Sequence, residues 1–94
     1  MAVRIAEVTC IARIRGADPY RALTHIGGFT DKQWKITKDR GIAYIKSGEW
    51  DFYVKRSTGE VHWLEVALTQ LGREYLKTEA DRDVPHILLS LPEC

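Results

Sequence analysis

Apolar and polar residues alternate at the start of the chain. In the segment from Val3 to Ile14 the even-numbered positions from Ala6 onward are small or aliphatic. The odd positions Glu7, Thr9 and Arg13 are polar, with Ile11 as the exception. A period of two is typical of a strand with one buried face. We therefore expect a single strand over this segment.

Two short helices are predicted in the following part of the chain. Asp18 is a good N-cap, its neighbour is a proline suited to the first helical turn, and Gly27 with its following glycine is a typical stop. Apolar residues recur every three positions between these signals. A brief strand is expected around residues 34–36. Thr37 then caps a second helix, which ends at Gly48.

Two segments of strand character, Trp50–Arg56 and Glu60–Thr69, flank a short turn and predict a β-hairpin. A two-residue turn would place a carboxylate on the apolar face. A three-residue turn ending at Gly59 instead places Val54 opposite His62 and keeps one face apolar. We prefer this second register.

The chain closes on an apolar segment that follows a short strand at residues 75–78. Leucines, a proline and a cysteine continue to the last residue, so residues 84–94 are expected to pack on the core. The order of elements predicts one α+β domain over residues 1–94. It would contain a mostly antiparallel sheet of four to five strands, with two short helices on one face.

The composition is typical of a globular domain, with 45% hydrophobic and 29% charged residues. We expect no membrane span, since no apolar run reaches about 18 residues, and no leader peptide. The two cysteines, Cys10 and Cys94, are far apart and too few for a secreted mini-protein. They are interpreted as reduced thiols, with a disulfide between them as the less favoured alternative, and the protein is interpreted as cytoplasmic.

Charge is divided unevenly along the chain. Residues 1–47 carry nine Lys or Arg and four Asp or Glu, a balance of +5, whereas residues 48–94 carry five and nine, a balance of −4. This asymmetry is compatible with a basic face. The alternative is that the two halves interleave and their charges pair, which the small size of the domain favours.

Several motifs are distinctive when they occur together. The tail reads Leu88-Leu89-Ser90-Leu91-Pro92-Glu93-Cys94 after Lys77-Thr78-Glu79-Ala80-Asp81, and shorter motifs are Thr9-Cys10-Ile11, Ile26-Gly27-Gly28 and Trp34-Lys35-Ile36-Thr37. Together they resemble a small bacterial family of uncharacterised proteins, the domain of unknown function 3892. The resemblance implies an architecture and a bacterial or phage setting. It carries over no catalytic residue.

No pattern of catalytic or metal-binding residues is found. No two of the histidines His25, His62 and His86 stand at metal-ligand spacing, and no Cys-x-x-Cys occurs. The thiolate of Cys94 would be disfavoured by its own α-carboxylate, and a nucleophile needs a base and a lowered pKa. We therefore expect no enzyme, no metal and no cofactor, and we interpret Cys94 as a small side chain of the core.

A cluster of cations around an indole is the strongest functional signal. It comprises Lys32, Trp34, Lys35, Lys38 and Arg40, and the exposed hairpin residues Tyr53 and Trp63 would extend it. Positive charge, a stacking surface and the free amides of a helix N-terminus suit phosphate and base recognition. The alternative is that Trp34 belongs to the core and the lysines to an ordinary solvated face.

A second polar group lies before the tail and comprises Lys77, Thr78, Asp81 and Arg82. One interpretation is a turn lock in which Asp81 accepts hydrogen bonds from Thr78 or a nearby amide. The other is the edge of a pocket in which Lys77 and Arg82 hold an anion. The turn lock is the plainer expectation.

Two functions remain after this reading. The first is a non-enzymatic module that binds nucleic acid or a nucleotide through the basic and aromatic face. The second is a structural or protein-interaction domain that forms a homodimer or docks a partner through the exposed hairpin face of Tyr53, Val61 and Trp63.

Overall fold

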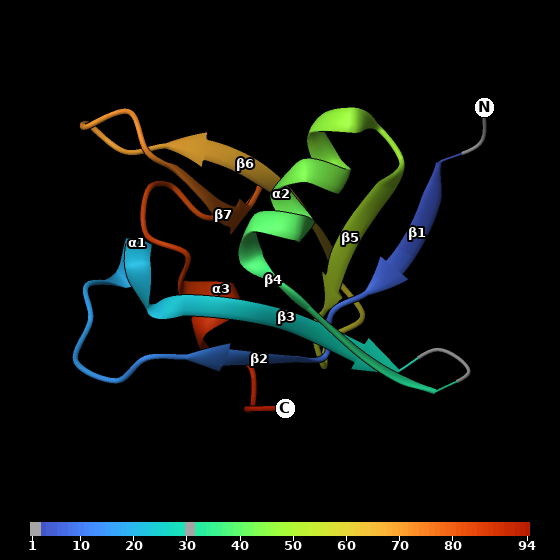
Figure 1. Cartoon of the computed structure of the whole chain (residues 1–94). Helices are drawn as coiled ribbons and strands as arrows, with labels where there is room; N and C mark the ends of the chain where they lie inside the picture. Colours follow the sequence, from blue (N-terminus) through green and yellow to red (C-terminus); the bar gives the residue numbers. More distant parts are fainter. Residues whose placement is uncertain (1–2, 30–31) are drawn as a thin grey trace.

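Two β-sheets share one helix between them in the computed structural model, which describes residues 3–29 and 32–94 (Figure 1). The elements in chain order are β1 (Arg4–Glu7), β2 (Cys10–Arg13), α1 (Pro19–Ala22), β3 (Leu23–Phe29), β4 (Gln33–Thr37), α2 (Lys38–Ser47), β5 (Trp50–Lys55), β6 (Val61–Leu68), β7 (Glu74–Thr78) and α3 (His86–Leu89).

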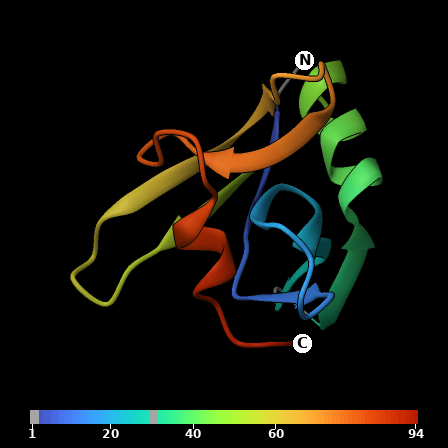
Figure 2. The ribbon, with the colours of Figure 1, turned by 90° about the vertical axis from the view of Figure 1, so that its left-hand side faces the viewer.

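The first sheet has the strand order β1-β5-β6-β7, with β1 parallel to β5 and the other pairs antiparallel. The second sheet, β2-β3-β4, is antiparallel throughout. Helix α2 packs against strands of both sheets, and the turn of the β5–β6 hairpin projects away from it (Figure 2). The α+β class is confirmed, but its strands form two sheets where the sequence predicts one. In the described part of the chain no helix is long and apolar enough to cross a membrane.

The predicted first strand is two strands in different sheets. The amide of Val8 donates to the carbonyl of Tyr53 at 2.8 Å, whereas the next amide, of Thr9, donates to the carbonyl of Gly27 at 2.9 Å. The chain therefore passes from one sheet to the other at this point. Side-chain alternation continues across the switch, since Val8 and Cys10 are both buried, so the sequence pattern gives no sign of it.

The predicted first helix was wrong beyond its first turn. Asp18 does cap it, and its carboxylate accepts hydrogen bonds from the amides of Tyr20 and Arg21. From Leu23 the chain is extended, because β3 pairs with strands on both sides and Ile26 is fully buried there. Tertiary pairing has overridden the local helical spacing.

The glycines that resemble a helix stop serve a close approach between backbones. A Cβ atom at Gly28 would lie only 2.3 Å from the carbonyl oxygen of Glu7, at the end of β1. It would also meet the indole of Trp34 at 3.0 Å. No side chain fits at this position without a shift of the backbone.

The second helix and the hairpin agree with the sequence. The Thr37 hydroxyl accepts from the amide of Arg40 at 3.2 Å, and Gly48 ends α2 in the left-handed region with φ 78°. In the hairpin Val54 pairs with His62, as the three-residue turn requires. Beyond Tyr53 the two strands take other partners, since β5 pairs with β1 and β6 with β7.

The C-terminal segment lies along β2. Leu88 has no exposed surface. The amide of Ile11 donates to the carbonyl of Pro92 at 3.0 Å, and the amide of Cys94 donates to the carbonyl of Ile11 at 2.9 Å. Figure 1 shows the C-terminus beside this strand. The tail thus covers one edge of the second sheet.

The expectation of two reduced thiols was wrong, because Cys10 and Cys94 form a disulfide with a Cα–Cα distance of 5.0 Å. Cys94 is therefore not a free core side chain. The two residues are separated by 84 positions in the sequence. Only the docking of the tail brings them together, which the spacing of the cysteines does not reveal.

Substitution of Gly28 by alanine should lower the free energy of unfolding by about 1–3 kcal/mol, as for an overpacked core. The clash is with a backbone carbonyl, which cannot rotate away as a side chain would. Urea denaturation would measure the loss, with Gln33→Ala on the neighbouring exposed position of β4 as a control that stays within about 0.5 kcal/mol. Equal stability of the two variants would contradict the close approach.

Substitution of Cys94 by serine should cost about 2–4 kcal/mol, because the disulfide closes most of the chain into one loop and restricts the unfolded state. Urea denaturation of the wild type with and without a thiol reductant provides the comparison. The reduced wild type should resemble Cys94→Ser. A wild type whose midpoint ignores the reductant would show that the disulfide adds nothing to stability.

Candidate functional site

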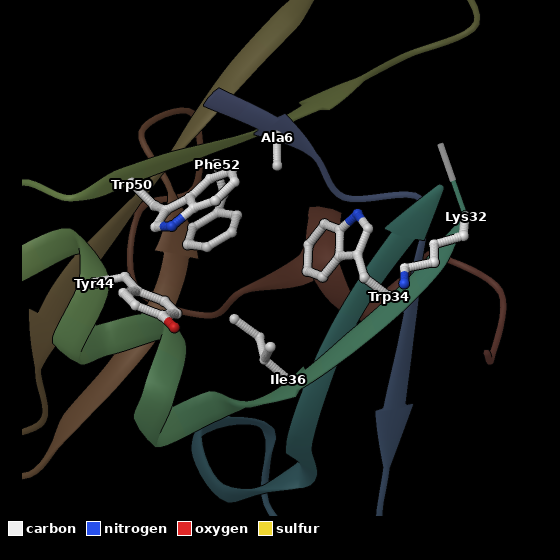
Figure 3. A pocket seen from close by; sticks show the side chains of 7 residues that line it. All are labelled: Ala6, Lys32, Trp34, Ile36, Tyr44, Trp50 and Phe52. Carbon is white, nitrogen blue, oxygen red and sulfur yellow. The ribbon is translucent and has the colours of Figure 1, made fainter. Parts of the chain in front are cut away.

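A cavity of about 290 Å³ opens between α2, β4 and β5 (Figure 3). It is mostly apolar, and the described residues that line it are Ala6, Lys32, Trp34, Ile36, Tyr44, Trp50 and Phe52. Its volume lies at the lower end of the usual range for small-molecule pockets, roughly 300–1,000 Å³. The space suits one ring system better than a large cofactor.

Strand alternation places the lining side chains. Trp34 and Ile36 stand two positions apart on β4, and Trp50 and Phe52 stand two positions apart on β5, so each pair shares a face of its strand. Figure 3 shows the β5 pair across the cavity from Trp34, with Tyr44 reaching in from α2. Residues from three elements therefore form one wall.

The rings around the cavity are in contact with one another. Trp50 and Phe52 are stacked with centroids 6.3 Å apart and planes 10° apart, and Phe52 lies 5.8 Å from Trp34. Tyr44 is tilted against Trp50 at 6.4 Å. The two tryptophans and Tyr44 are only half-buried, so part of their surface remains open to a bound ring.

Three cations surround the aromatic wall. The guanidinium of Arg4 lies 5.7 Å from the centre of the Trp50 ring, and that of Arg40 lies 5.9 Å from the Tyr44 ring. Lys32 lines the cavity itself. None of the described lining residues is acidic, so the local charge favours an anionic ligand over a cationic one.

Trp34 combines the two roles that the sequence leaves open. It packs against the hydrophobic core, yet it also lines the cavity. Its indole N–H is enclosed and has no acceptor among the described residues, and Figure 3 shows the nitrogen turned away from Tyr44. The ring is therefore available to a ligand through its benzo part and not through its N–H.

The other residues of the predicted basic and aromatic face are dispersed. Lys35 follows Trp34 on β4, so its exposed side chain points to the opposite face of the strand. Lys38 lines a second hollow, which does not include Trp34. Tyr53 and Trp63 pair with each other on the face of the first sheet that lies away from Phe52. The structure brings Lys32 and Trp34 together and leaves Arg40 above Tyr44.

The Thr78–Asp81 turn lock is present. The carboxylate of Asp81 accepts from the amide of Thr78 at 3.1 Å, from its hydroxyl at 3.0 Å, and from the amide of Ile87 at 3.4 Å. The ammonium of Lys77 is buried, pairs with Glu65 and donates to two backbone carbonyls. The Asp81 carboxylate therefore joins the tail to β7, and the Lys77 ammonium is already engaged, while Arg82 is exposed.

A second hollow has Tyr20 and Tyr75 in its wall together with Lys38. The two tyrosine rings meet edge to face at 4.9 Å, and the Tyr75 hydroxyl donates to the carbonyl of Asp83 at 2.7 Å. Burial, with the nearby Tyr20 and Asp83 charges, raises the pKa of Tyr75 above its ordinary value of 10.0. This tyrosine fastens the tail to α1 and β7.

Substitution of Tyr75 by phenylalanine should cost about 1 kcal/mol at neutral pH through the lost hydrogen bond. Because the pKa of Tyr75 is raised in the folded protein, its hydroxyl keeps its proton to a higher pH there than in the unfolded chain. The resulting stabilisation is complete below about pH 10 and is lost as the pH rises through the folded pKa. Urea denaturation at about pH 8 and about pH 11 should therefore show the gap between wild type and variant narrowing. A gap that stays constant would contradict a titrating Tyr75.

Among the described residues no group of three or more His, Cys, Asp and Glu side chains is arranged to hold a metal ion. The residues that sequence reasoning missed at the cavity are Arg4, Tyr44, Trp50 and Phe52. The spacing of two between Trp50 and Phe52 indicates one apolar face of the hairpin, and it gives no sign of an open cavity. Which apolar face stays partly open depends on how α2 sits beside β5.

The fold and the site together define a small α+β domain with a ligand-sized aromatic cavity. A family model described as a protein of unknown function, DUF3892, matches residues 7–92, and the chain belongs to this family. Neither the curated proteins nor the solved structures contain a significant match.

Proposed function

We propose that this protein is a binding module for a nucleotide, either free or as a unit of a single-stranded nucleic acid. The base occupies the aromatic cavity, and the phosphate lies at its rim near Lys32. The observation that supports this most directly is an aromatic wall surrounded by three cations, Arg4, Lys32 and Arg40.

The stacking surface supports a flat ligand. A base has two π-faces, and stacking of one base on aromatic side chains contributes about 1–3 kcal/mol. The stacked pair Trp50 and Phe52 stands across the cavity from Trp34 in Figure 3. Because Phe52 and Trp34 already lie 5.8 Å apart, a planar ring would stack with one face on the open part of this aromatic wall.

The charge distribution supports a ligand with a phosphate. Lys32 is exposed and lies at the cavity, so its ammonium can contact a phosphate without a large desolvation cost. Arg4 and Arg40 already lie over ring faces, and their outer N–H groups remain donors for a phosphate oxygen. The cavity thus offers separate surfaces to the two parts of a nucleotide.

Substitution of Lys32 by alanine should weaken the binding of adenosine monophosphate by about tenfold, the effect of one lost charge-assisted contact. Adenosine, which has no phosphate, should bind equally to both proteins. Indole ¹H–¹⁵N shifts of Trp34 and Trp50 would measure both affinities. The matched control is Lys35→Ala, which removes the same charge from the opposite face of β4 and should change the affinity by less than about twofold.

Three results would overturn the proposal. These are the absence of any Trp34 or Trp50 shift, equal effects of the two lysine substitutions, or equal losses for adenosine and its monophosphate. A short oligodeoxyadenylate, titrated at two salt concentrations, distinguishes a free nucleotide from a nucleic-acid strand. Only a strand that contacts several cations should show a steep loss of affinity with salt.

A second candidate function is protein docking through the hairpin. The Tyr53 and Trp63 rings lie 5.5 Å apart, and Trp63 and Val61 are 36% and 41% exposed. Exposed apolar residues that cluster in this way are typical of contact surfaces. A partner or a second copy of the chain would cover them. Contact through these apolar surfaces alone should depend little on moderate salt, unlike the binding of a nucleic-acid strand.

The proposal also includes the absence of catalysis and the location that the sequence predicts. The module binds without a catalytic step and acts in a bacterial cytoplasm. Reduced cysteines would support a cytoplasmic location, but Cys10 and Cys94 form a disulfide, and disulfides persist mainly in oxidising surroundings. The location therefore depends on the bacterial resemblance and not on the cysteines.

A further inference from the structure

A row of four side chains crosses the outer face of the first sheet. Glu7 of β1 is the register partner of Tyr53 on β5, which is the partner of Trp63 on β6. The amide of Glu79, directly after β7, donates to the carbonyl of Trp63 at 2.8 Å. Because paired residues point to the same face, the Tyr53 and Trp63 rings lie side by side, 5.5 Å apart, with Glu7 at one end of the row. At the other end one oxygen of the Glu79 carboxylate accepts from the Trp63 amide at 3.4 Å, which holds the second oxygen beside the row.

This row lies on the face opposite to the aromatic cavity. Phe52, the neighbour of Tyr53 in β5, lines the cavity, and successive side chains of a strand point to opposite faces. Trp63 is 36% exposed and Glu79 is exposed as well. The row is therefore a surface of its own and does not extend the cavity, as the sequence had suggested for Tyr53 and Trp63.

The charges beside the rings are mainly negative. Asp51 lies two positions from Tyr53 on the same face of β5, so it adds to the carboxylates at the ends of the row. Glu65 and Lys77 neutralise each other in a salt bridge. Lys55 is the described cation beside the rings on β5, opposite Val61. Within residues 3–29 and 32–94 no arginine or lysine covers the Tyr53 or Trp63 ring, although Arg4 covers Trp50 and Arg40 covers Tyr44.

We propose that this row docks an arginine side chain from a basic segment of a partner protein. A guanidinium is planar and weakly hydrated, and it is attracted to the faces of Trp and Tyr rings. Placed over Trp63 and Tyr53, it would have Glu7 on one side and Glu79 on the other as acceptors for its N–H groups. Charge complementarity is what selects this partner, because the same carboxylates repel the phosphates of a nucleic acid.

The proposal gives a chemistry to the protein-docking alternative and does not depend on nucleotide binding in the cavity. The test uses the ¹⁵N-labelled protein and a six-residue peptide in which glycine and arginine alternate. Matched peptides carry lysine or glutamate in place of arginine. The indole signal of Trp63 should shift with the arginine peptide, less with the lysine peptide, and not with the glutamate peptide. The indole signals of Trp34 and Trp50 should not shift with any of the three peptides.

The double substitution Glu7→Gln and Glu79→Gln removes both charges and keeps the shape of the row. It should weaken the arginine peptide at least about tenfold. The control is the double substitution Glu49→Gln and Glu74→Gln, which makes the same change in net charge away from the row. Glu49 lies in the α2–β5 turn, and Glu74 begins β7 and pairs with Lys46 of α2. This control should alter the affinity less than about twofold. Thermal unfolding of all variants establishes that they are folded.

Several outcomes would overturn the proposal. They are no Trp63 shift with the arginine peptide, equal shifts with the arginine and glutamate peptides, or equal losses in the two double variants. A Trp63 shift with an oligonucleotide in place of the peptide would assign this face to nucleic acid. Concentration-dependent sedimentation that the Trp63→Leu substitution abolishes would assign it to a second copy of the chain. A negative nucleotide titration, read at Trp34 and Trp50, leaves these readouts unaffected.

Discussion

The arrangement of the two sheets depends on the close approach of one carbonyl to one glycine. The oxygen of Glu7 lies only 2.3 Å from the place that a Cβ atom of Gly28 would occupy, so the end of β1 passes close over β3. The chain then moves from one sheet to the other between Val8 and Thr9. Gly28 is also the register partner of Trp34, and the missing side chain leaves room for the indole. The same contact therefore joins the sheets and positions one wall of the cavity.

Features decided by neighbouring residues could be predicted from the sequence, whereas features decided by distant contacts could not. The cap at Thr37, the left-handed Gly48 and the turn before Glu60 depend on a few adjacent residues, and all three are present. The sheet switch and the disulfide depend on residues far apart in the chain. The segment after Leu23 shows the conflict directly, because its local spacing is helical while its partners on both sides are strands.

Only some of the residues that line the cavity could be predicted from the sequence, for the same reason. Lys32 and Trp34 stand out in the sequence because a cation beside an indole is a local signal. Tyr44 and Phe52 do not, since an aromatic residue on an apolar face predicts a core position equally well. Whether such a ring is enclosed or lines an open space depends on the distance between α2 and β5. That distance follows from the packing of both sheets and from no single segment.

The uneven charge of the two halves is partly paired and partly gathered on one face, so both interpretations from the sequence apply in part. Arg13 with Glu93 and Lys46 with Glu74 join the basic first half to the acidic second half, so part of the asymmetry is paired. The cations beside the cavity, at positions 4, 32 and 40, all come from the first half. The two faces of β5 therefore differ in charge as well as in the direction of their rings. Alternation along a single strand is sufficient to give a small domain two surfaces that differ in charge.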